Sequence, residues 1–243
     1  GYDESGYGCA GDEAPIWRIL EEKSFSIHPR IISTVDVVPF ALINGEICVG
    51  LQKRETYPYK DQYALPGQFI HLNEDQNTDD TVNRIKDKFL TQNVYCEQVH
   101  TIAGANRDIR GPNGWAMSVI YMGLIPLNDV DNIQNNIEFF SINALPTDIA
   151  FDHKELIKIA YQRLVDKSSY SNYPMFLMDS TFSLSDLIKA YEDIVLHKFD
   201  QSSFRRKIRE KDILEEVGKG KGKGSPVLMK NKRGAVLFDK SIV

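Results

Sequence analysis

The chain has 243 residues and a formal net charge of -5, with 42% hydrophobic and 26% charged residues. This composition is typical of a soluble globular protein of one or two domains, and no apolar run approaches the ~20 residues that span a bilayer. Three widely spaced cysteines, Cys9, Cys48 and Cys96, indicate neither a disulfide framework nor a zinc site, so we expect a cytoplasmic protein without a membrane role.

Residues 1–30 are expected to form a flexible N-terminal segment. The first fifteen residues are small, acidic and aperiodic, and they lack the basic-then-apolar order of a signal peptide. Apolar residues among charges at 16–23 allow one short amphipathic helix within this segment.

Residues 31–165 are predicted to form an α+β domain. Two β-branched runs flank Asn44-Gly45, the strongest short signal for a β-hairpin. Val82, Ile85 and Phe89 recur at spacings of three and four, which predicts a helix over 78–90. Further strands are expected at 97–105, 115–127 and 137–146, followed by a helix over 152–167.

The hydrophobic pattern dissolves between residues 166 and 180, which we interpret as a linker before a second domain at 181–243. A helix capped by Ser183 is expected over 182–198, and a second helix over 201–210. Two strands, 226–229 and 235–239, are predicted to enclose a turn at 230–234. Helix, turn, helix and hairpin together are the layout of a winged helix-turn-helix.

Charge is segregated along the chain. Residues 196–234 contain twelve Lys or Arg and five Asp or Glu, so this segment carries +7 while the remainder carries -12. A basic segment with this layout favours binding to double-stranded DNA, although a charge run can also be only a solvated surface.

Candidate DNA contacts follow from the faces of the second helix. If Phe204 and Ile208 face the core, the arginines at 205, 206 and 209 project outward, where they can reach bases or phosphates. A glycine-spaced lysine arm and a basic cluster at the tip of the wing suit phosphate neutralisation. The candidate DNA-binding residues are Gln201, Ser202, Ser203, Arg205, Arg206, Lys207, Arg209, Lys221, Lys223, Lys230, Lys232 and Arg233.

The stretch "ALPGQFIHLNEDQ", residues 64–76, resembles the opening of a Nudix box. The full box continues into a helix whose glutamates hold divalent metal against a diphosphate. If Arg84 is the motif arginine, the glutamate positions fall on Ile85, Lys88 and Phe89. Two other registers place them on Arg84, Asp87 and Lys88, or on Asn83, Lys86 and Asp87.

In each register at most one carboxylate remains, and Gln68 replaces the second glycine of the motif. We therefore predict that the domain binds a ligand but is not an enzyme, with no catalytic residue, no metal site and no cofactor. Asp152 and His153 at a helix start are interpreted as a cap and a buried hydrogen-bond partner, because no Ser or Cys nucleophile motif accompanies them.

From about residue 31 to residue 237, the chain resembles the Nudix-related transcriptional regulators of the NrtR family. The resemblance rests on "LQKR", "YALPGQFI", Arg84, "GANRDIRG" with "WAMSVIYM", "AFDHKELIKIAYQRL" and "FDQSSFRRKI". It implies a Nudix-like mixed β-sheet/α sandwich followed by a winged helix, and a homodimer that binds a palindromic operator and usually represses. In the NAD-linked branch of the family the effector is ADP-ribose, whereas other branches sense pentoses.

ADP-ribose or a related nucleotide is the favoured effector, which would link the protein to NAD metabolism. Cations around the expected pocket suit a diphosphate, and Phe69 and Trp115 are candidates for stacking on a base. The candidate ligand-binding residues are Lys53, Arg54, Gln68, Phe69, Arg107 and Arg110.

Three alternatives remain open. The chain could be a pentose-responsive regulator of the same family, or an active Nudix pyrophosphatase with a basic nucleic-acid-binding tail. It could also be an architectural nucleic-acid binder whose first domain is vestigial.

Overall fold

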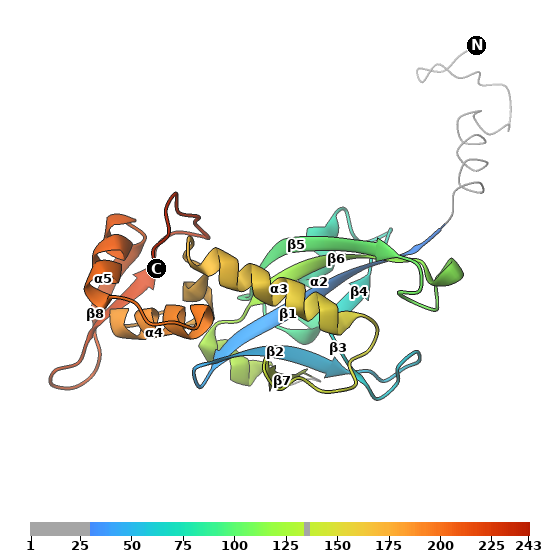
Figure 1. The fold of residues 1–243 in the computed structure, drawn as a ribbon, viewed down its shortest axis with the longest axis horizontal. Helices are drawn as coiled ribbons and strands as arrows, with labels where there is room; N and C mark the ends of the chain where they lie inside the picture. The colour runs from blue at the N-terminus through green and yellow to red at the C-terminus, as the bar shows by residue number, and fades with distance from the viewer. Residues whose placement is uncertain (1–29, 134–136) are drawn as a thin grey trace, which may run out of the picture.

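The computed structural model describes residues 30–133 and 137–243 (Figure 1). The flexible segment expected at residues 1–30 therefore lies, apart from Arg30, outside the described residues. The elements of the first unit are β1 (Ile32–Ile43), β2 (Glu46–Lys53), β3 (Tyr63–Ala64), β4 (Gly67–Phe69), α2 (Thr78–Phe89), β5 (Tyr95–Gly104), η1 (Pro112–Gly114), β6 (Ala116–Leu124), η2 (Leu127–Asn132), β7 (Ile137–Ser141) and α3 (His153–Ser168).

A mixed seven-stranded sheet forms the centre of this unit. Strand β1 runs parallel to β6 and antiparallel to β2 and β4, while β5 pairs with β6, and β3 and β7 pair with β2. The β1–β2 turn is the predicted one, since Asn44 and Gly45 both have positive φ angles, 50° and 78°, as a two-residue hairpin turn requires.

Helices cover the two faces of the sheet. Alternate residues of β1 point to opposite sides, so that Val35 and Val37 pack with α2 while Val38 and Phe40 pack with α3. Helix α3 crosses one face of the sheet in Figure 1. The predicted α+β sandwich is confirmed, and the predicted helix over 78–90 is α2.

The segment after α3 is packed rather than extended. A short 3-10 helix, η3 (Tyr173–Leu177), follows α3, and Tyr173 and Leu177 are buried in the same core as the sheet. The first residues of the expected linker, 166–168, belong to α3 itself. The exact domain boundaries, 31–165 and 181–243, stay predictions.

The C-terminal unit contains α4 (Leu184–Val195), α5 (Gln201–Glu210), β8 (Leu214–Lys219) and β9 (Val227–Asn231). Ser183 caps α4 as predicted, because its hydroxyl oxygen accepts a hydrogen bond from the Asp186 amide at 3.1 Å. Phe204 and Ile208 of α5 are buried in the core of this unit, so the predicted helix-turn-helix with a hairpin is confirmed.

The predicted wing strand over 226–229 corresponds to β9, but the second predicted strand, 235–239, is wrong, because the partner of β9 is β8. The hairpin pairs β8 with β9, and its tip is the glycine- and lysine-rich loop over 220–226. Glu215, Glu216 and Gly218 are poor strand formers. Strand β8 is exposed from Glu215 onward, so it has no buried face that requires apolar alternation. Gly222 and Gly224 supply positive φ angles in the loop.

The two units pack against each other. Ile194 of α4 is buried in the core that contains β2 and α3, and the Tyr191 hydroxyl donates to the Ser171 carbonyl at 2.6 Å. The β1–β2 turn also lies close to α4. A Cβ atom added to Gly45 in this turn would be 3.3 Å from the Lys189 ammonium group of α4. Within residues 30–133 and 137–243, no helix has both the length and the apolarity to cross a membrane.

Candidate functional site: an effector pocket and a basic helix

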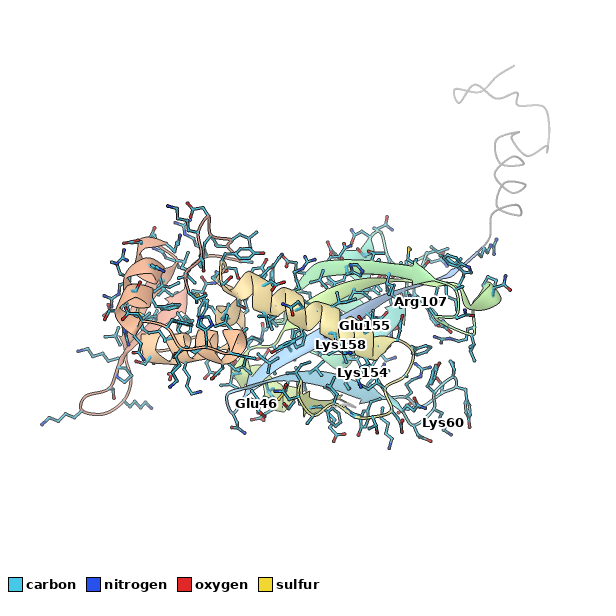
Figure 2. All side chains as sticks on the ribbon, in the orientation of Figure 1. Glu46, Lys60, Arg107, Lys154, Glu155 and Lys158 are labelled. Carbon is cyan, nitrogen blue, oxygen red and sulfur yellow. The ribbon has the colours of Figure 1, made fainter. Side chains whose placement is uncertain are left out.

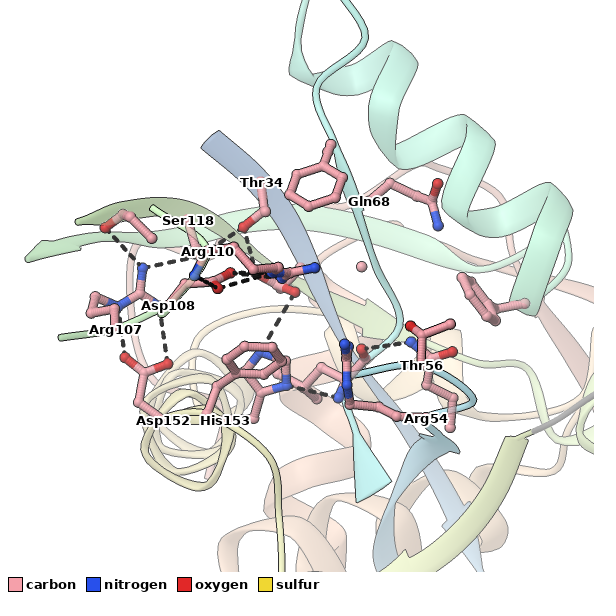
Figure 3. A pocket seen from close by; sticks show the side chains of 18 of the residues that line it. Thr34, Arg54, Thr56, Gln68, Arg107, Asp108, Arg110, Ser118, Asp152 and His153 are labelled. Atoms are coloured by element: carbon pink, nitrogen blue, oxygen red, sulfur yellow. Dashed lines mark hydrogen bonds and ion pairs between the residues drawn. The ribbon is translucent and has the colours of Figure 1, made fainter. Parts of the chain in front are cut away.

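A cavity of about 410 Å³ opens in the first unit, between the ends of several strands and α2 (Figure 3). Strands β1, β2 and β4 contribute to its wall, as do the last turn of α2, the loop over 107–110 and the turn before α3. All six predicted ligand-binding residues line it: Lys53, Arg54, Gln68, Phe69, Arg107 and Arg110. Trp115, the second stacking candidate, is not among the lining residues.

Arg107 is held by protein contacts. Its Nε and Nη2 donate to the two carboxylate oxygens of Asp152 at 2.7 and 3.0 Å, and its Nη1 donates to Ser118 and to two backbone carbonyls. The Arg107 side chain is only 10% exposed. Figures 2 and 3 show Arg107 beside the N-terminal end of α3, where this network joins the helix to the sheet. Its charge is already neutralised by Asp152.

Arg54 and Arg110 are held differently. Arg110 forms a bidentate ion pair with Asp108, with a shortest distance of 2.6 Å. Arg54 donates its Nε to the Pro58 carbonyl at 2.7 Å, and it makes no ion pair with any described residue. Burial, followed by repulsion from Arg110, lowers the pKa of Arg54. The charge of Asp108 partly opposes this lowering, but no described carboxylate lies within ion-pair distance of Arg54 in the cavity wall.

Phe151 was missed from the sequence. It lines the cavity, and the guanidinium carbons of Arg54 and Arg110 lie 4.9 and 5.5 Å from the centre of its ring. The only signal in the sequence is an aromatic residue just before the start of α3, and such a residue is more often part of the core.

Helix α2 presents Lys88 and Phe89 to the cavity. Its orientation is fixed by Arg84, which donates to both carboxylate oxygens of Asp75 at 2.9 and 2.6 Å and to the Phe69 carbonyl at 3.0 Å. Lys88 and Phe89 are the glutamate positions when Arg84 is taken as the motif arginine. In that register two of the three positions line the cavity, whereas the third, Ile85, is buried in the core. Within the described part of the chain, no three His, Cys, Asp or Glu residues are grouped so that they could hold a metal ion.

His153 is a buried hydrogen-bond partner, as predicted. Its Nδ1 accepts a hydrogen bond from the Leu65 amide at 3.0 Å, its Nε2 lies 3.8 Å from Asp36 Oδ1, and burial lowers its pKa. The expected capping role of Asp152 is wrong, because its side chain makes no capping bond and binds Arg107 instead.

The exposed side of α5 is basic. Gln201 and Ser202 are exposed at its N-terminal end, and the side chains of Ser202, Arg205, Arg206, Arg209 and Glu210 line a shallow hollow on its surface. Arg205 donates to the Ser185 hydroxyl at 3.0 Å, which holds it against α4. Ser203, whose amide is capped by Asp200, and Lys207 are half-buried beside this face.

The basic residues of the wing divide into two groups. Lys221 and Lys223 are exposed in the loop between β8 and β9, which projects away from the helices (Figures 1 and 2). The prediction that Lys230, Lys232 and Arg233 lie at the wing tip is wrong, since they lie at the base of the hairpin. There Lys232 and Arg233 pair with Asp212 at 2.7 and 3.3 Å, and Lys230 pairs with Glu215 at 3.4 Å.

Comparison with known proteins supports both halves of this description. Residues 174–238 match the family model of the NrtR DNA-binding winged helix domain. The chain is 35% identical over 207 residues to the ADPR responsive transcriptional repressor NtrR of Acinetobacter baylyi, covering 83% of this chain and 82% of that protein. The chain belongs to the NrtR family.

A solved NrtR, from Shewanella oneidensis in complex with a 27mer DNA, has a TM-score of 0.76 to this chain at 26% identity, covering 86% of this chain and 98% of that one. The NUDIX domain of the same NrtR, in complex with ADP ribose, has a TM-score of 0.50 at 25% identity, covering 62% of this chain and 99% of that one. An ADP-ribose pyrophosphatase of Methanocaldococcus jannaschii is 28% identical over 147 residues, covering 58% of this chain and 78% of that enzyme.

Proposed function

We propose that this member of the NrtR family is an ADP-ribose-responsive transcriptional repressor. The observation that carries the proposal is the combination, in one chain, of a cation-lined cavity beside a Nudix-like helix and a winged helix with a basic outer face. The Acinetobacter relative is an ADPR responsive repressor, and the Shewanella relative forms complexes with DNA and, through its NUDIX domain, with ADP ribose. Such a protein fits control of NAD metabolism, and it would act in the cytoplasm.

The winged unit is proposed to bind DNA as part of a homodimer. In helix-turn-helix dimers the second helix enters the major groove, and two half-sites lie about one helical turn apart. Helix α5, with Arg206 and Arg209 exposed, takes the place of that helix, while Lys221 and Lys223 at the wing tip suit phosphate contacts. A palindromic operator follows from the symmetry of the dimer.

The cavity is proposed to bind the effector through five of its predicted residues: Lys53, Arg54, Gln68, Phe69 and Arg110. Arg107, the sixth, would act by holding the wall in place. A site with several cations suits a phosphorylated ligand better than a neutral pentose, because charge-assisted hydrogen bonds to phosphate are roughly twice as strong as neutral ones. This charge distribution favours ADP-ribose over the pentose alternative.

Repression would be relieved allosterically. Effector binding shifts the chain toward an arrangement in which the two α5 helices no longer match the half-sites. A coupling of about 1–3 kcal/mol would lower DNA affinity roughly 5- to 150-fold. The test is a mobility shift of the full chain on a duplex that it has selected from a random library, titrated with ADP-ribose, NAD and L-arabinose. Release by ADP-ribose alone supports the proposal, whereas release by L-arabinose alone would make the chain a pentose regulator.

Hydrolysis is not part of the proposed function, because Lys88 and Phe89 stand where a hydrolase needs metal-binding carboxylates. The similarity to the Methanocaldococcus pyrophosphatase keeps the enzyme as the second candidate. Incubation with ADP-ribose and Mg²⁺ or Mn²⁺ is expected to yield no AMP. If AMP were formed by the parent chain and not by the Glu74→Gln variant, the pyrophosphatase would become the first candidate and the non-hydrolytic repressor the second.

A further inference from the structure

Phe151 adopts a strained backbone conformation at the edge of the cavity. Its φ angle is 56°, in the left-handed region that a bulky residue rarely enters. Strain of this kind persists only where surrounding contacts determine the conformation, and it is concentrated at functional sites.

The turn around Phe151 is fixed on both sides. The Ala150 amide donates to the Tyr63 carbonyl at 2.8 Å, and His153 accepts from the Leu65 amide at 3.0 Å. Asp152, between them, is held by Arg107. The ring itself packs edge-on against Tyr59, with centroids 4.8 Å apart. These contacts fix the position of the ring at the wall of the cavity.

The fixed ring brings two like charges together. Arg54 and Arg110, here called the arginine pair, both lie within the ~6 Å range of a cation–π interaction with Phe151. Phe69 supports Arg110 from a second ring at 5.0 Å. Two neighbouring guanidinium groups repel each other, and the rings and Asp108 offset this repulsion.

Several N–H groups of the arginine pair make no hydrogen bond to the described protein. Neither terminal nitrogen of Arg54, nor Nη1 of Arg110, donates a hydrogen bond to any residue of the described chain. Arg107, by contrast, uses all three of its nitrogens. The unused donors come from two separate side chains, so they match an anion with two adjacent charged groups.

We propose that Phe151 is a positioning residue that holds the arginine pair as a receptor for the two linked phosphates of the effector. The cavity then selects diphosphates over monophosphates and over uncharged sugars. This inference rests on the proposed function. It adds that the diphosphate is the part of the effector that is recognised, and that Phe151 positions the arginines that recognise it.

The test is calorimetric titration of the full chain with ADP-ribose, inorganic pyrophosphate, ribose 5-phosphate and inorganic phosphate. For the parent chain, we expect pyrophosphate to compete with ADP-ribose and to bind at least tenfold more tightly than phosphate. Phe151→Asn removes the ring, while asparagine tolerates the left-handed backbone. We expect this variant to melt close to the parent temperature and to bind ADP-ribose and pyrophosphate at least tenfold more weakly, with its affinity for phosphate nearly unchanged.

Three further variants sharpen the comparison. Phe151→Tyr keeps the ring and should restore diphosphate binding to within about threefold of the parent. Arg54→Gln should remove the preference for pyrophosphate over phosphate, and it carries the test if Phe151→Asn does not fold. Tyr57→Leu changes an exposed aromatic residue outside the cavity wall and should leave all affinities unchanged.

The outcomes separate this inference from the proposed function. Pyrophosphate binding that depends on Phe151 and Arg54, without binding of ADP-ribose, supports the diphosphate receptor and rejects the proposed effector. Normal DNA release by ADP-ribose, with Phe151→Asn and Arg54→Gln both binding ADP-ribose as the parent does, overturns the inference and leaves the repressor intact. An equal loss of affinity for all four ligands also overturns it.

Discussion

Arg107 and Arg54 line the same cavity, but their charges are balanced in different ways. Arg107 has a bidentate carboxylate partner and low exposure, whereas Arg54 has no described carboxylate within ion-pair distance and shares the more distant charge of Asp108 with Arg110. A buried ion pair costs desolvation energy that only good geometry repays, and removing one partner leaves an uncompensated buried charge. Arg107 therefore holds the wall of the site in place, and we propose that Arg54 is kept for the ligand.

Loss of Asp152 is expected to destabilise the fold. Asp152→Ala leaves the 10%-exposed Arg107 side chain without its partner, which costs about 3 kcal/mol of the free energy of unfolding. Urea denaturation of the full chain measures the loss. Glu210→Ala is the matched control, because it breaks an exposed pair with Arg206 and should cost less than ~1 kcal/mol. Equal losses in the two variants would contradict the structural role of Arg107.

His153 is expected to make stability depend on pH below its unperturbed pKa of 6.5. Burial lowers its pKa in the folded state, so the unfolded chain takes up the proton first as the pH falls. Above pH 6.5 the residue contributes nothing to the pH dependence; below it, the free energy of unfolding falls by up to about 1.4 kcal/mol per pH unit until the folded pKa is reached.

His153→Asn retains an acceptor for the Leu65 amide and removes the titration. The difference in stability between the parent and this variant should therefore change between pH 7 and lower pH, as followed by urea denaturation at each pH. If the free energies of unfolding of the parent and the variant changed equally with pH, His153 would not stay neutral in the folded chain.

Much of the cavity could be predicted at the residue scale, because the motif places Gln68 and Phe69 in it and the flanking cations follow the same strands and loops. Phe151 could not. Its φ angle and its neighbours are set by two tertiary hydrogen bonds, one from the Ala150 amide to the Tyr63 carbonyl and one from the Leu65 amide to His153. No periodicity or motif in the sequence reports such contacts.

Among the elements, the long helices were the most predictable, because their apolar spacing persists over several turns. Strands β3 and β4 are too short, at two and three residues, to carry a recognisable alternation. Strand β8 of the wing was missed for another reason, because it is exposed from Glu215 onward. Without a buried face, β8 shows no apolar alternation that would mark the strand or the position of the tip.

The corrected wing makes a specific prediction about DNA binding. Lys221→Ala at the tip should weaken binding to all duplexes alike and lower the salt slope by about 1. Lys232→Ala at the base is the control, because Lys232 is already paired with Asp212 at 2.7 Å. Fluorescence anisotropy over a series of salt concentrations gives both slopes. A larger change for Lys232→Ala than for Lys221→Ala would contradict the hairpin described above.

On the scale of the whole molecule, the cavity and the winged unit are physically connected. Strand β2 begins at the turn that contacts α4 and ends at Lys53 in the cavity wall. Helix α4 buries Ile194 in the core of the first unit and packs Tyr191 against Phe204 of α5. A change at the cavity thus has a continuous packed route to the helix that is proposed to read DNA.

Coupling between two sites is reciprocal, so it can be measured from the effector side. The decisive measurement is the affinity of the full chain for ADP-ribose, determined by calorimetry without DNA and again in the presence of a saturating selected duplex. If ADP-ribose releases DNA, the duplex must weaken ADP-ribose binding by the same factor, roughly 5- to 150-fold. Equal affinities in the two conditions would contradict an ADP-ribose-responsive repressor, even if each ligand binds tightly by itself.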